Sequence, residues 1–414
     1  MAPGAAAQRG AQPEPAVRAT LLVAFEAIAE RHLDAPEPAD MALAWLNGLS
    51  DIDPMLSARH AGQRLELRFG GRVLASQARP ASPAAAATSA ARLLRDALAA
   101  SPAIQRAEPE AILAASFAAV FRPLDAFSRF VPASEAATAR AERSGRSGLG
   151  LLLGPGPRGA PVVTATTPRG AAMEAGVRVG DEILTIDGVP VGAGDVALAT
   201  LLLDGPDGTD AVLRVRRGGR GLVVRIGRQP PAGAGVQVEA RPDGVLVLRV
   251  PAFRAGTAGR IVAAVAEGPV RGVILDLRGN GGGVLSEALA VADLFLETGR
   301  MARSEGRHPD ANRSWDAGPP DILGGLPVVV LVDGRTASAA EVLAAALAEQ
   351  RRGAVVGSTT RGKGLTQIVV PLPGDAELHV SWARLFTPGG EPIEGGGVRP
   401  DICTAADGRA SAQA

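Results

Sequence analysis

The sequence predicts a multidomain α/β protein with three successive regions: a mainly helical N-terminal region, a β-rich middle region with two short helices, and a C-terminal α/β region with a mixed sheet. The first observation behind this prediction is the length of 414 residues, which at roughly 150 residues per domain gives two or three domains. The second is a change near Gly148 from helical spacing of apolar residues to short β-like runs separated by glycines. The third is an alternation of apolar strands and helices after Gly235.

The composition is that of a folded globular protein. Hydrophobic residues make up 46% and charged residues 21% of the chain, which argues against a largely disordered or fibrous protein. The 43 Lys and Arg residues balance the 43 Asp and Glu residues, so no net charge favours nucleic acid or anionic lipid. The single cysteine, Cys403, excludes intrachain disulfides and a multi-cysteine metal site, and the four histidines leave little for zinc. We therefore expect no metal, no cofactor and no nucleic-acid partner.

The two ends of the chain, residues 1–20 and 406–414, are expected to be flexible tails. Ala5, Ala6 and Ala7 resemble the small-residue site at which signal peptides are cleaved, although the basic and apolar parts of a signal peptide are absent. One interpretation is that an upstream signal peptide is missing from this sequence, and the other is a plain tail rich in alanine, proline and glycine. No uncharged apolar run reaches the roughly eighteen residues that a membrane span requires, so a transmembrane protein is not expected.

The N-terminal region, residues 21–145, is predicted to be mainly helical. Apolar residues recur three and four positions apart in 21–28 and again in 111–120, which predicts amphipathic helices. Alternation in 64–69, followed by two glycines and a second short run, predicts a small hairpin. Two connecting segments are expected: the Ala/Ser/Pro run 80–89 as a linker, and the charged run 136–146 leading to the next region.

The middle region, residues 146–230, is predicted to be a small β-rich domain. Short β-like runs are separated by glycines, and two short helical segments interrupt them. The expected strands are 148–153, 161–166, 182–186, 211–215 and 221–226, and the expected helices are 171–175 and 195–203.

The C-terminal region, residues 231–405, follows a Pro/Gly linker at 230–235 and shows the alternation that is typical of an α/β domain. Its last two predicted strands suggest that the sheet is mixed. Residues 300–320 are interpreted as a surface loop. The expected strands are 245–250, 272–277, 327–332, 354–356, 367–372 and 377–385, and the expected helices are 261–266, 285–296 and 339–348.

Ser338 lies where the apolar strand 327–332 leads into an Ala/Leu helix, so it is predicted at a helix N-terminus. The simpler interpretation is structural, because Ser338 and Glu341 have the spacing of a capping box. The second interpretation is chemical, because the free N–H groups and the positive dipole end of a helix N-terminus can stabilise an oxyanion during acyl transfer. The position permits a nucleophile without requiring one.

A serine nucleophile needs a base, and no histidine lies near Ser338 along the chain, although His308 and His379 stay open as candidates. Lys363 stands between two glycines, and lysine can replace histidine in serine hydrolases. A lysine base must be neutral, which requires burial to lower its pKa from about 10.4 toward 7 or 8. In an extended segment Gln367 would share a face with Lys363 and could orient its amine. The simpler interpretation is an exposed loop lysine.

A glycine-rich turn follows the predicted strand 272–277. A phosphate-binding loop is disfavoured, because the Gly-Lys-Ser/Thr of the P-loop is absent and the dinucleotide fingerprint lacks its third glycine. Glycines also let main-chain N–H groups approach a ligand carbonyl closely, so Gly283 could supply one half of an oxyanion hole.

Four motifs appear in order along the chain: Asp276-Leu-Arg-Gly-Asn-Gly-Gly-Gly283, Thr336-Ala-Ser-Ala-Ala-Glu341, Gly362-Lys-Gly-x-x-Gln367, and Thr387-Pro-Gly-Gly followed by Val398-Arg-Pro-Asp-Ile402. Together they closely resemble the carboxyl-terminal processing peptidases, also called tail-specific proteases. The resemblance implies a serine endopeptidase of the crotonase/Clp-peptidase-like fold class that forms an acyl-enzyme intermediate. It implies Ser338 as the nucleophile, Lys363 as the general base, Gln367 as its orienting partner, and the N–H groups of Gly283 and Ala339 as the oxyanion hole.

The middle region resembles the PDZ domain of the same family, through Gly148-Leu-Gly-Leu151 and the glycine-rich run 168–188. Such domains bind a free C-terminus by adding it to a strand edge, while loop N–H groups hold the carboxylate. The resemblance therefore implies protein or peptide substrates with a free C-terminus. It places their binding at Gly148, Leu149, Gly150 and Leu151, with Leu151 and Leu153 lining an apolar pocket.

The resemblance covers the chain from about Glu110 onward, including residues 124–132, which are similar to the segment that precedes the PDZ domain of the family. It implies a periplasmic location, with the cytoplasm left open, and leaves room for an adaptor or activating protein. Two residues depart from the usual pattern: Ala340 stands where the family usually has serine, and Arg361 where it usually has an aromatic residue.

Two alternatives from other classes stay open from the residues alone. In the first, the chain is a catalytically silent PDZ scaffold in which the same residues only cap and pack. In the second, it is an acyl-CoA enzyme on the related crotonase fold, which would explain the glycine turn but not a Ser/Lys pair. Cleavage of an unfolded protein would distinguish a protease from both.

Overall fold

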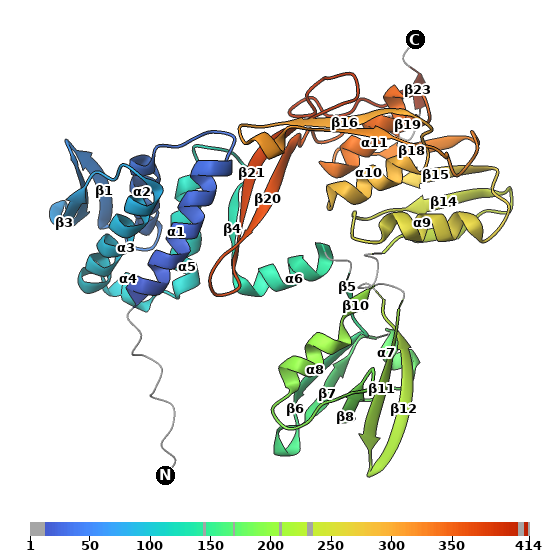
Figure 1. Cartoon of the computed structure of the whole chain (residues 1–414), viewed down its shortest axis with the longest axis horizontal. Coiled ribbons are helices and arrows are strands. Elements are labelled where there is room, and N and C mark those ends of the chain that lie inside the picture. The colour runs from blue at the N-terminus through green and yellow to red at the C-terminus, as the bar shows by residue number, and fades with distance from the viewer. Residues whose placement is uncertain are drawn as a thin grey trace. The chain divides into compact units, whose positions relative to one another are not determined.

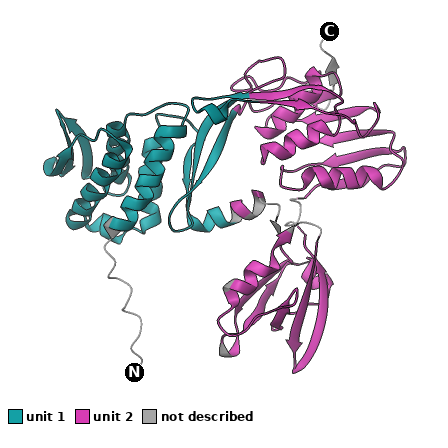
Figure 2. Cartoon of the chain, in the orientation of Figure 1, with its two compact units in different colours: residues 1–138, 304–313, 365–384 teal, residues 139–303, 314–364, 385–414 magenta. Residues whose placement is uncertain are grey.

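The computed structural model describes residues 13–143, 146–168, 170–206, 209–229, 235–404 and 410–412 (Figure 1). Ala5, Ala6 and Ala7 and nearly all of the 230–235 linker lie outside the described residues. The chain divides into two compact units, coloured in Figure 2: residues 1–138, 304–313 and 365–384, and residues 139–303, 314–364 and 385–414. Among the described residues, no helix has both the length and the apolar character needed to cross a membrane.

The first unit contains a group of helices and a 3-stranded sheet, in which β2 lies between β1 and β3 and pairs antiparallel with both. Phe25, Trp45 and Phe117 are fully buried in its core. The elements are α1 (Pro13–Arg31), α2 (Pro38–Asn47), η1 (Gly48–Asp51), β1 (Leu56–Ala61), β2 (Arg64–Phe69), β3 (Arg72–Ala78), α3 (Pro83–Ala100), α4 (Pro102–Arg106), α5 (Pro109–Phe121), β4 (Arg129–Val131) and α6 (Ala133–Arg143).

Most predicted elements of this region are confirmed: α1 and α5 contain the two predicted helices, and β2 and β3 form the hairpin. The linker predicted at 80–89 is wrong, because α3 begins at Pro83. Ser82 caps this helix by accepting the N–H of Ala85 at 3.2 Å, and proline suits the first helical turn. The alanine run that resembled a linker supplies a buried helix face.

The surface loop predicted at 300–320 is also wrong, because it contains strands β16 (Gly299–Glu305) and β17 (Arg313–Ala317). Met301 and Ala302 are both buried although they are adjacent in the chain. Two neighbouring buried residues interrupt the alternation by which a strand is recognised in a sequence.

The two late predicted strands are β20 (Leu365–Pro371) and β21 (Glu377–Phe386). They pair antiparallel with each other, and β21 also pairs with β4. The sequence suggested that these two strands make the C-terminal sheet mixed. They do not, because they belong to a separate sheet.

The middle region folds around a sheet with the order β12-β11-β8-β7-β6, so β6 lies at an edge; β9 pairs with β8 outside this path. Every strand and helix predicted here is confirmed, although β6 begins at Leu151 rather than at Gly148. The elements are β5 (Arg146–Ser147), β6 (Leu151–Pro155), η2 (Pro157–Gly159), β7 (Pro161–Thr166), α7 (Ala171–Glu174), β8 (Glu182–Ile186), β9 (Val189–Pro190), α8 (Val196–Leu203), β10 (Gly205–Pro206), β11 (Asp210–Arg217) and β12 (Arg220–Gly227).

The C-terminal region contains a 7-stranded sheet with the order β13-β14-β15-β18-β19-β22-β23. Strands β14 to β22 run parallel in this order, whereas β13 and β23 pair antiparallel at the two edges, so the sheet is mixed as predicted. Helix α11 is buried from Ala339 to Leu347. The further elements are β13 (Gln237–Ala240), β14 (Val245–Arg249), α9 (Thr257–Ala266), β15 (Gly272–Asp276), α10 (Leu285–Asp293), η3 (Pro309–Ala311), β18 (Val328–Val332), α11 (Ala339–Glu349), β19 (Ala354–Gly357), β22 (Ile402–Thr404) and β23 (Ala410–Ala412). The predicted α/β fold class is confirmed.

Candidate active site

Ser338 is the N-cap of α11, as predicted. Its φ is +58°, and a positive φ in a residue with a side chain costs about 1 to 3 kcal/mol and is found most often at functional sites. The turn before it is held by the Asp333 carboxylate, which accepts the N–H groups of Arg335 and Thr336 at 3.0 Å each. The Thr336 hydroxyl donates to the Leu277 carbonyl at 2.9 Å. The strained serine is thereby fixed to the ends of two adjacent strands, β15 and β18.

Glu341, in the first turn of α11, is fully buried. Its Oε2 accepts the N–H of Ser338 at 2.7 Å and the N–H of Lys363 at 2.9 Å. Its Oε1 accepts the N–H of Gly362 at 2.6 Å and the hydroxyl of Thr360 at 2.5 Å. Sequence reasoning anticipated only the capping bond to Ser338. The bonds to residues 360–363 show that one carboxylate holds the Lys363 loop beside the start of α11.

Lys363 is half-buried in the loop between β19 and β20. Its flanking glycines allow a close approach of another chain segment: a Cβ at Gly362 would lie 3.0 Å from the Gly395 carbonyl carbon, and one at Gly364 would lie 2.2 Å from the Glu394 nitrogen. Gly364 also donates its N–H to the Glu394 carboxylate at 2.7 Å. The exposed loop lysine considered from the sequence is therefore not what the structure shows.

The glycine turn after β15 packs against the start of α11. A Cβ at Gly282 would lie 2.9 Å from Cβ of Ser338, and one at Gly283 would lie 2.1 Å from the Phe253 oxygen. Both glycines have positive φ, 105° and 128°. The turn can therefore lie this close to Ser338 only because these positions carry no side chain.

Two polar side chains shape this turn. The amide oxygen of buried Asn280 accepts the N–H of Gly282 at 2.8 Å, and its Nδ2 donates to the Val250 carbonyl at 2.9 Å. Asp333 accepts the N–H of Gly279 at 2.9 Å. Burial would raise the pKa of Asp333, but this bond and those from Arg335 outweigh it and lower the pKa. The turn is thus anchored by an ionised carboxylate at neutral pH.

The N–H groups of Gly283 and Ala339 donate no hydrogen bond to another residue within the described ranges. Ala339 is the first residue of α11, where an N–H has no intrahelical partner. These are the two groups that the resemblance assigns to the oxyanion hole, and both are available to a ligand oxygen.

Gln367 lies on β20, and its Nε2 donates to the Leu365 carbonyl at 3.3 Å and to the Ser381 hydroxyl at 3.4 Å. The register of β20 against β21 shifts between Thr366 and Gln367, and Lys363 precedes the strand. The even spacing that placed Gln367 and Lys363 on one face does not apply, because a bulge changes the alternation of side chains. An orienting role for Gln367 stays a prediction.

The two histidines considered as alternative bases have carboxylate neighbours of their own. His308 Nε2 lies 3.3 Å from Glu30 Oε1, and His379 Nε2 lies 3.2 Å from Glu377 Oε2. The hydrogen bonds of Ser338 and Glu341 given above involve neither histidine. Within the described residues, no group of three or more His, Cys, Asp or Glu side chains is arranged to hold a metal ion.

The predicted peptide-binding residues, Gly148, Leu149, Gly150 and Leu151, lead into the edge strand β6. The carbonyl groups of the first three accept main-chain N–H groups of the same domain at 2.8 to 3.1 Å. The N–H groups of Leu149 and Gly150 donate to no other residue in the part of the chain that is described. The loop therefore directs its acceptors inward and has donors left for a ligand.

The side chains of β6 alternate as expected for such a site. Leu151 and Leu153 are half-buried and pack against the core of the middle region, whereas Leu152 is 66% exposed. A strand added beside β6 would meet the first two leucines on the face that carries the core.

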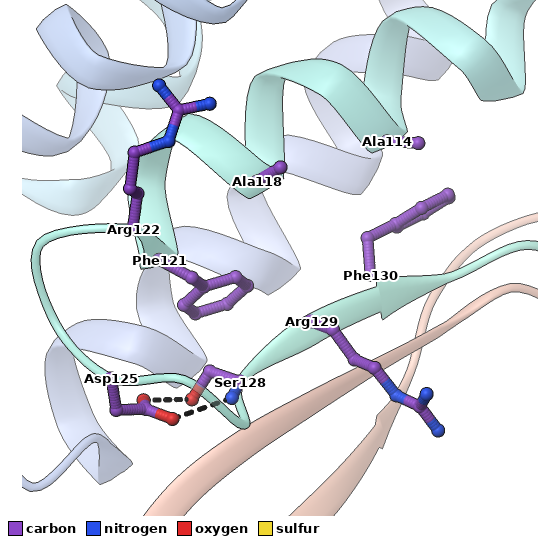
Figure 3. A pocket seen from close by; sticks show the side chains of 8 residues that line it. All are labelled: Ala114, Ala118, Phe121, Arg122, Asp125, Ser128, Arg129 and Phe130. Carbon is purple, nitrogen blue, oxygen red and sulfur yellow. Dashed lines mark hydrogen bonds between the residues drawn. The ribbon is translucent and has the colours of Figure 1, made fainter.

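A cavity of about 300 Å³ lies in the first unit between α5 and β4 (Figure 3). Figure 3 shows the Asp125 carboxylate bonded to Ser128, whose hydroxyl and N–H it accepts at 2.5 and 2.7 Å. None of the predicted site residues lines this cavity, so it is not the candidate active site. The lining residues are Ala114, Ala118, Phe121, Arg122, Asp125, Ser128, Arg129 and Phe130.

Two family models match the chain. Residues 244–404, which contain Gly283, Ser338 and Lys363, match Peptidase family S41. The C-terminal region is therefore similar, over these residues, to the peptidase domain of family S41. Residues 162–217 match the PDZ domain, so the middle region is a PDZ domain, as the resemblance implied.

Three curated relatives are similar to this chain. The Carboxy-terminal-processing protease of Bartonella bacilliformis is 33% identical over 240 residues, covering 56% of this chain and 55% of the relative. The Carboxyl-terminal-processing peptidase 1, chloroplastic, of Arabidopsis thaliana is 34% identical over 243 residues, covering 56% and 50%. The C-terminal processing peptidase, chloroplastic, of Tetradesmus obliquus is 33% identical over 303 residues, covering 67% and 64%. The matches thus span between half and just under two thirds of these relatives.

Proposed function

We propose that this chain is a serine endopeptidase that cleaves protein substrates whose free C-terminal tail is bound by the PDZ domain. Ser338 is the nucleophile, Lys363 the general base and Gln367 its orienting partner, and the N–H groups of Gly283 and Ala339 form the oxyanion hole. The proposed boundaries are 146–230 for the PDZ domain and 231–405 for the protease core.

One observation carries this proposal: the buried Glu341 carboxylate bonds the main chain of both Ser338 and Lys363. A capping serine needs no link to a lysine in a distant loop, whereas a nucleophile and its base must be held in a fixed geometry. Glu341 does this through the main-chain N–H groups of both residues. We regard it as a positioning residue.

In the proposed reaction, the neutral amine of Lys363 takes the hydroxyl proton of Ser338 as the oxygen attacks the substrate carbonyl. The tetrahedral intermediate collapses when Lys363 returns the proton to the leaving amine, which departs with the C-terminal fragment. Ser338 is then acylated, and a water deprotonated by the same amine hydrolyses the ester. One basic group thus serves both steps.

The oxyanion of the intermediate would be held by the N–H groups of Gly283 and Ala339. Both are fixed in the main chain, so they need little reorganisation as charge develops. Loss of a single oxyanion donor in other serine proteases costs about 10²- to 10³-fold in kcat. The dipole of α11 adds a positive end at the same place.

Cleavage of an unfolded protein by the purified chain tests this proposal. Wild type should cleave and Ser338→Ala should not, while Ser286→Ala, at an exposed serine of α10, should match wild type. Cleavage by the purified chain alone would also show that no adaptor is required. Equal cleavage by wild type and Ser338→Ala would contradict the assignment of the nucleophile.

Recognition of the tail is tested separately with the full-length Ser338→Ala chain, which should bind without cutting. A peptide with a free, apolar C-terminus should bind more tightly than its amidated form. Only the free peptide has a terminal carboxylate that can accept the N–H groups of Leu149 and Gly150. Equal affinity for both peptides would contradict carboxylate capture. Binding of tails by a wild-type chain that never cleaves would instead favour the silent PDZ scaffold.

The periplasmic location implied by the resemblance is part of the proposal. Fractionation of the native host followed by detection of the chain tests it, with enrichment in the periplasm expected. Recovery with the cytoplasmic fraction would contradict it.

A further inference from the structure

Three neighbouring parallel strands, β15, β18 and β19, end in the loops that carry Gly283, Ser338 and Lys363. The carboxyl ends of parallel strands meet at one edge of the sheet, where open α/β sheets bind ligands. Each of these loops also carries an exposed arginine, and none of the three has a role in the proposed reaction. They are Arg278, Arg335 and Arg361.

The contacts of the loops bring Arg335 and Arg361 close to the candidate site. Arg361 donates its N–H to the Thr336 carbonyl at 2.9 Å, which joins it to the loop of Arg335. A Cβ at Gly279 would lie 3.7 Å from an Nη atom of Arg335, so this guanidinium lies over the glycine turn. Arg335 precedes Ser338 by three positions, and Arg361 precedes Lys363 by two.

The three arginines differ in how far their side chains are engaged by carboxylates. Arg278 is engaged with Asp276, whose side chain is 6% exposed, through contacts of 2.9 and 2.8 Å. Arg335 contacts Asp333 at 3.1 and 3.2 Å, but its own side chain is 81% exposed, and such a pair in water is weak and easily exchanged. Arg361 has no ion pair or side-chain hydrogen bond with any residue of the described ranges.

A further carboxylate, Glu394, reaches the Lys363 loop and accepts the N–H of Gly364 at 2.7 Å. It contacts the loop after Lys363, whereas Arg361 precedes Lys363. The Glu341 carboxylate is buried and is occupied by main-chain and hydroxyl donors. The guanidinium groups of Arg335 and Arg361 are therefore the ones at this edge that are exposed and not held by a buried carboxylate.

We propose that Arg335 and Arg361 give the protease a preference for substrates with acidic side chains near the cleaved bond. This inference rests on the proposed function and names the substrate class of the same site. A guanidinium binds a carboxylate through two parallel N–H···O bonds, which a neutral amide of the same shape cannot match. Because both arginines are exposed, the preference is modest and is screened by salt.

The test uses two peptides with the same apolar free C-terminus and the same cleavage segment, flanked by Glu in one and Gln in the other. Wild type should show a kcat/KM about three- to tenfold higher for the Glu peptide at low ionic strength, falling toward unity in 0.5 M salt. Arg361→Gln and Arg335→Gln should each lower this ratio, and the double variant should bring it close to one. Arg260→Gln, at an exposed arginine of α9, should keep the wild-type ratio.

Equal kcat/KM for the two peptides in wild type would overturn the inference, and so would an unchanged ratio in the double variant or the same fall in Arg260→Gln. All three results leave the proposed protease function intact, because cleavage is still observed. Failure of wild type to cleave either peptide or an unfolded protein would overturn the proposed function and this inference with it.

Discussion

Two carboxylates with buried side chains, Glu341 in the second unit and Asp125 in the first, each accept several hydrogen bonds but join different parts of the chain. Glu341 accepts main-chain N–H groups of Ser338, Gly362 and Lys363 and the hydroxyl of Thr360. Asp125 accepts the ring nitrogen of His32 at 2.8 Å, the hydroxyl of Ser381 at 2.9 Å, and donors from Phe127 and Ser128. Glu341 joins the loops proposed for chemistry, whereas Asp125 joins the end of α1 to β21.

The donors also differ in chemical type. The groups around Glu341 are N–H and hydroxyl donors that do not titrate in the physiological range. Asp125 has a histidine among its partners. Burial would raise the pKa of the Asp125 carboxyl, but the hydrogen bonds from His32, Ser128 and Phe127 outweigh it and hold the pKa well below its usual range. The comparison predicts that Glu341 controls turnover and that Asp125 controls stability.

The largest effect is expected for Glu341→Gln. The amide has one acceptor oxygen instead of two, and its NH₂ group would face N–H donors. We expect turnover to fall by about 100-fold or more and stability to fall by about 2 to 4 kcal/mol, measured on folded protein by peptide cleavage and by urea unfolding. Glu349→Gln, at the exposed end of the same helix, should change both by little. Normal turnover in folded Glu341→Gln would contradict the prediction that Glu341 controls turnover.

The glycine turn provides the second test, because it depends on the contact with Ser338. Gly282→Ala should lower turnover about tenfold or more, since its φ is +105° and the added Cβ would lie 2.9 Å from Cβ of Ser338. Gly281→Ala should be close to wild type, because a Cβ there meets nothing within 4 Å. Equal losses from the two substitutions would show that the turn matters only for folding.

Asp125→Asn should have the opposite balance from Glu341→Gln. Loss of charged hydrogen bonds is expected to destabilise the protein by about 1.5 to 3 kcal/mol, while turnover of the folded fraction falls severalfold at most. Asp51→Asn, which removes only the exposed 3.5 Å pair with Arg122, should change stability by less than about 0.5 kcal/mol. A turnover loss as large as that of Glu341→Gln would place Asp125 in the catalytic machinery instead.

The smallest expected effect is on the free energy of unfolding at acidic pH. The pKa of Asp125 is lower in the folded state than its unfolded value near 3.9. The ionised carboxylate therefore stabilises the folded state above the unfolded pKa, and this stabilisation is lost as pH falls toward the folded pKa. The stability difference between wild type and Asp125→Asn should therefore shrink between about pH 5 and pH 2. Unfolding free energies measured across this range check it, and a difference independent of pH would contradict it.

The strands and helices of the PDZ domain and the parallel core were predictable because each has a local periodic pattern. Ser338 and Lys363 could be proposed as site residues because each belongs to a short motif. The role of Glu341 was not, because its partners Gly362 and Lys363 lie far along the chain and bind through N–H groups that every residue shares. The helix at Pro83 was missed because alanine and serine occur in both linkers and helix starts.

The central claim is that Ser338 and Lys363 act as one catalytic unit. The most direct measurement compares turnover of one unfolded protein by wild type, Ser338→Ala, Lys363→Ala and the double variant, with thermal unfolding confirming that each is folded. Because neither residue has a role without the other, each single substitution should lower turnover by a similar factor, about 10³ or more. The double substitution should lower it no further. Near-wild-type turnover in Lys363→Ala would contradict the claim and direct the search for a base to His308 and His379.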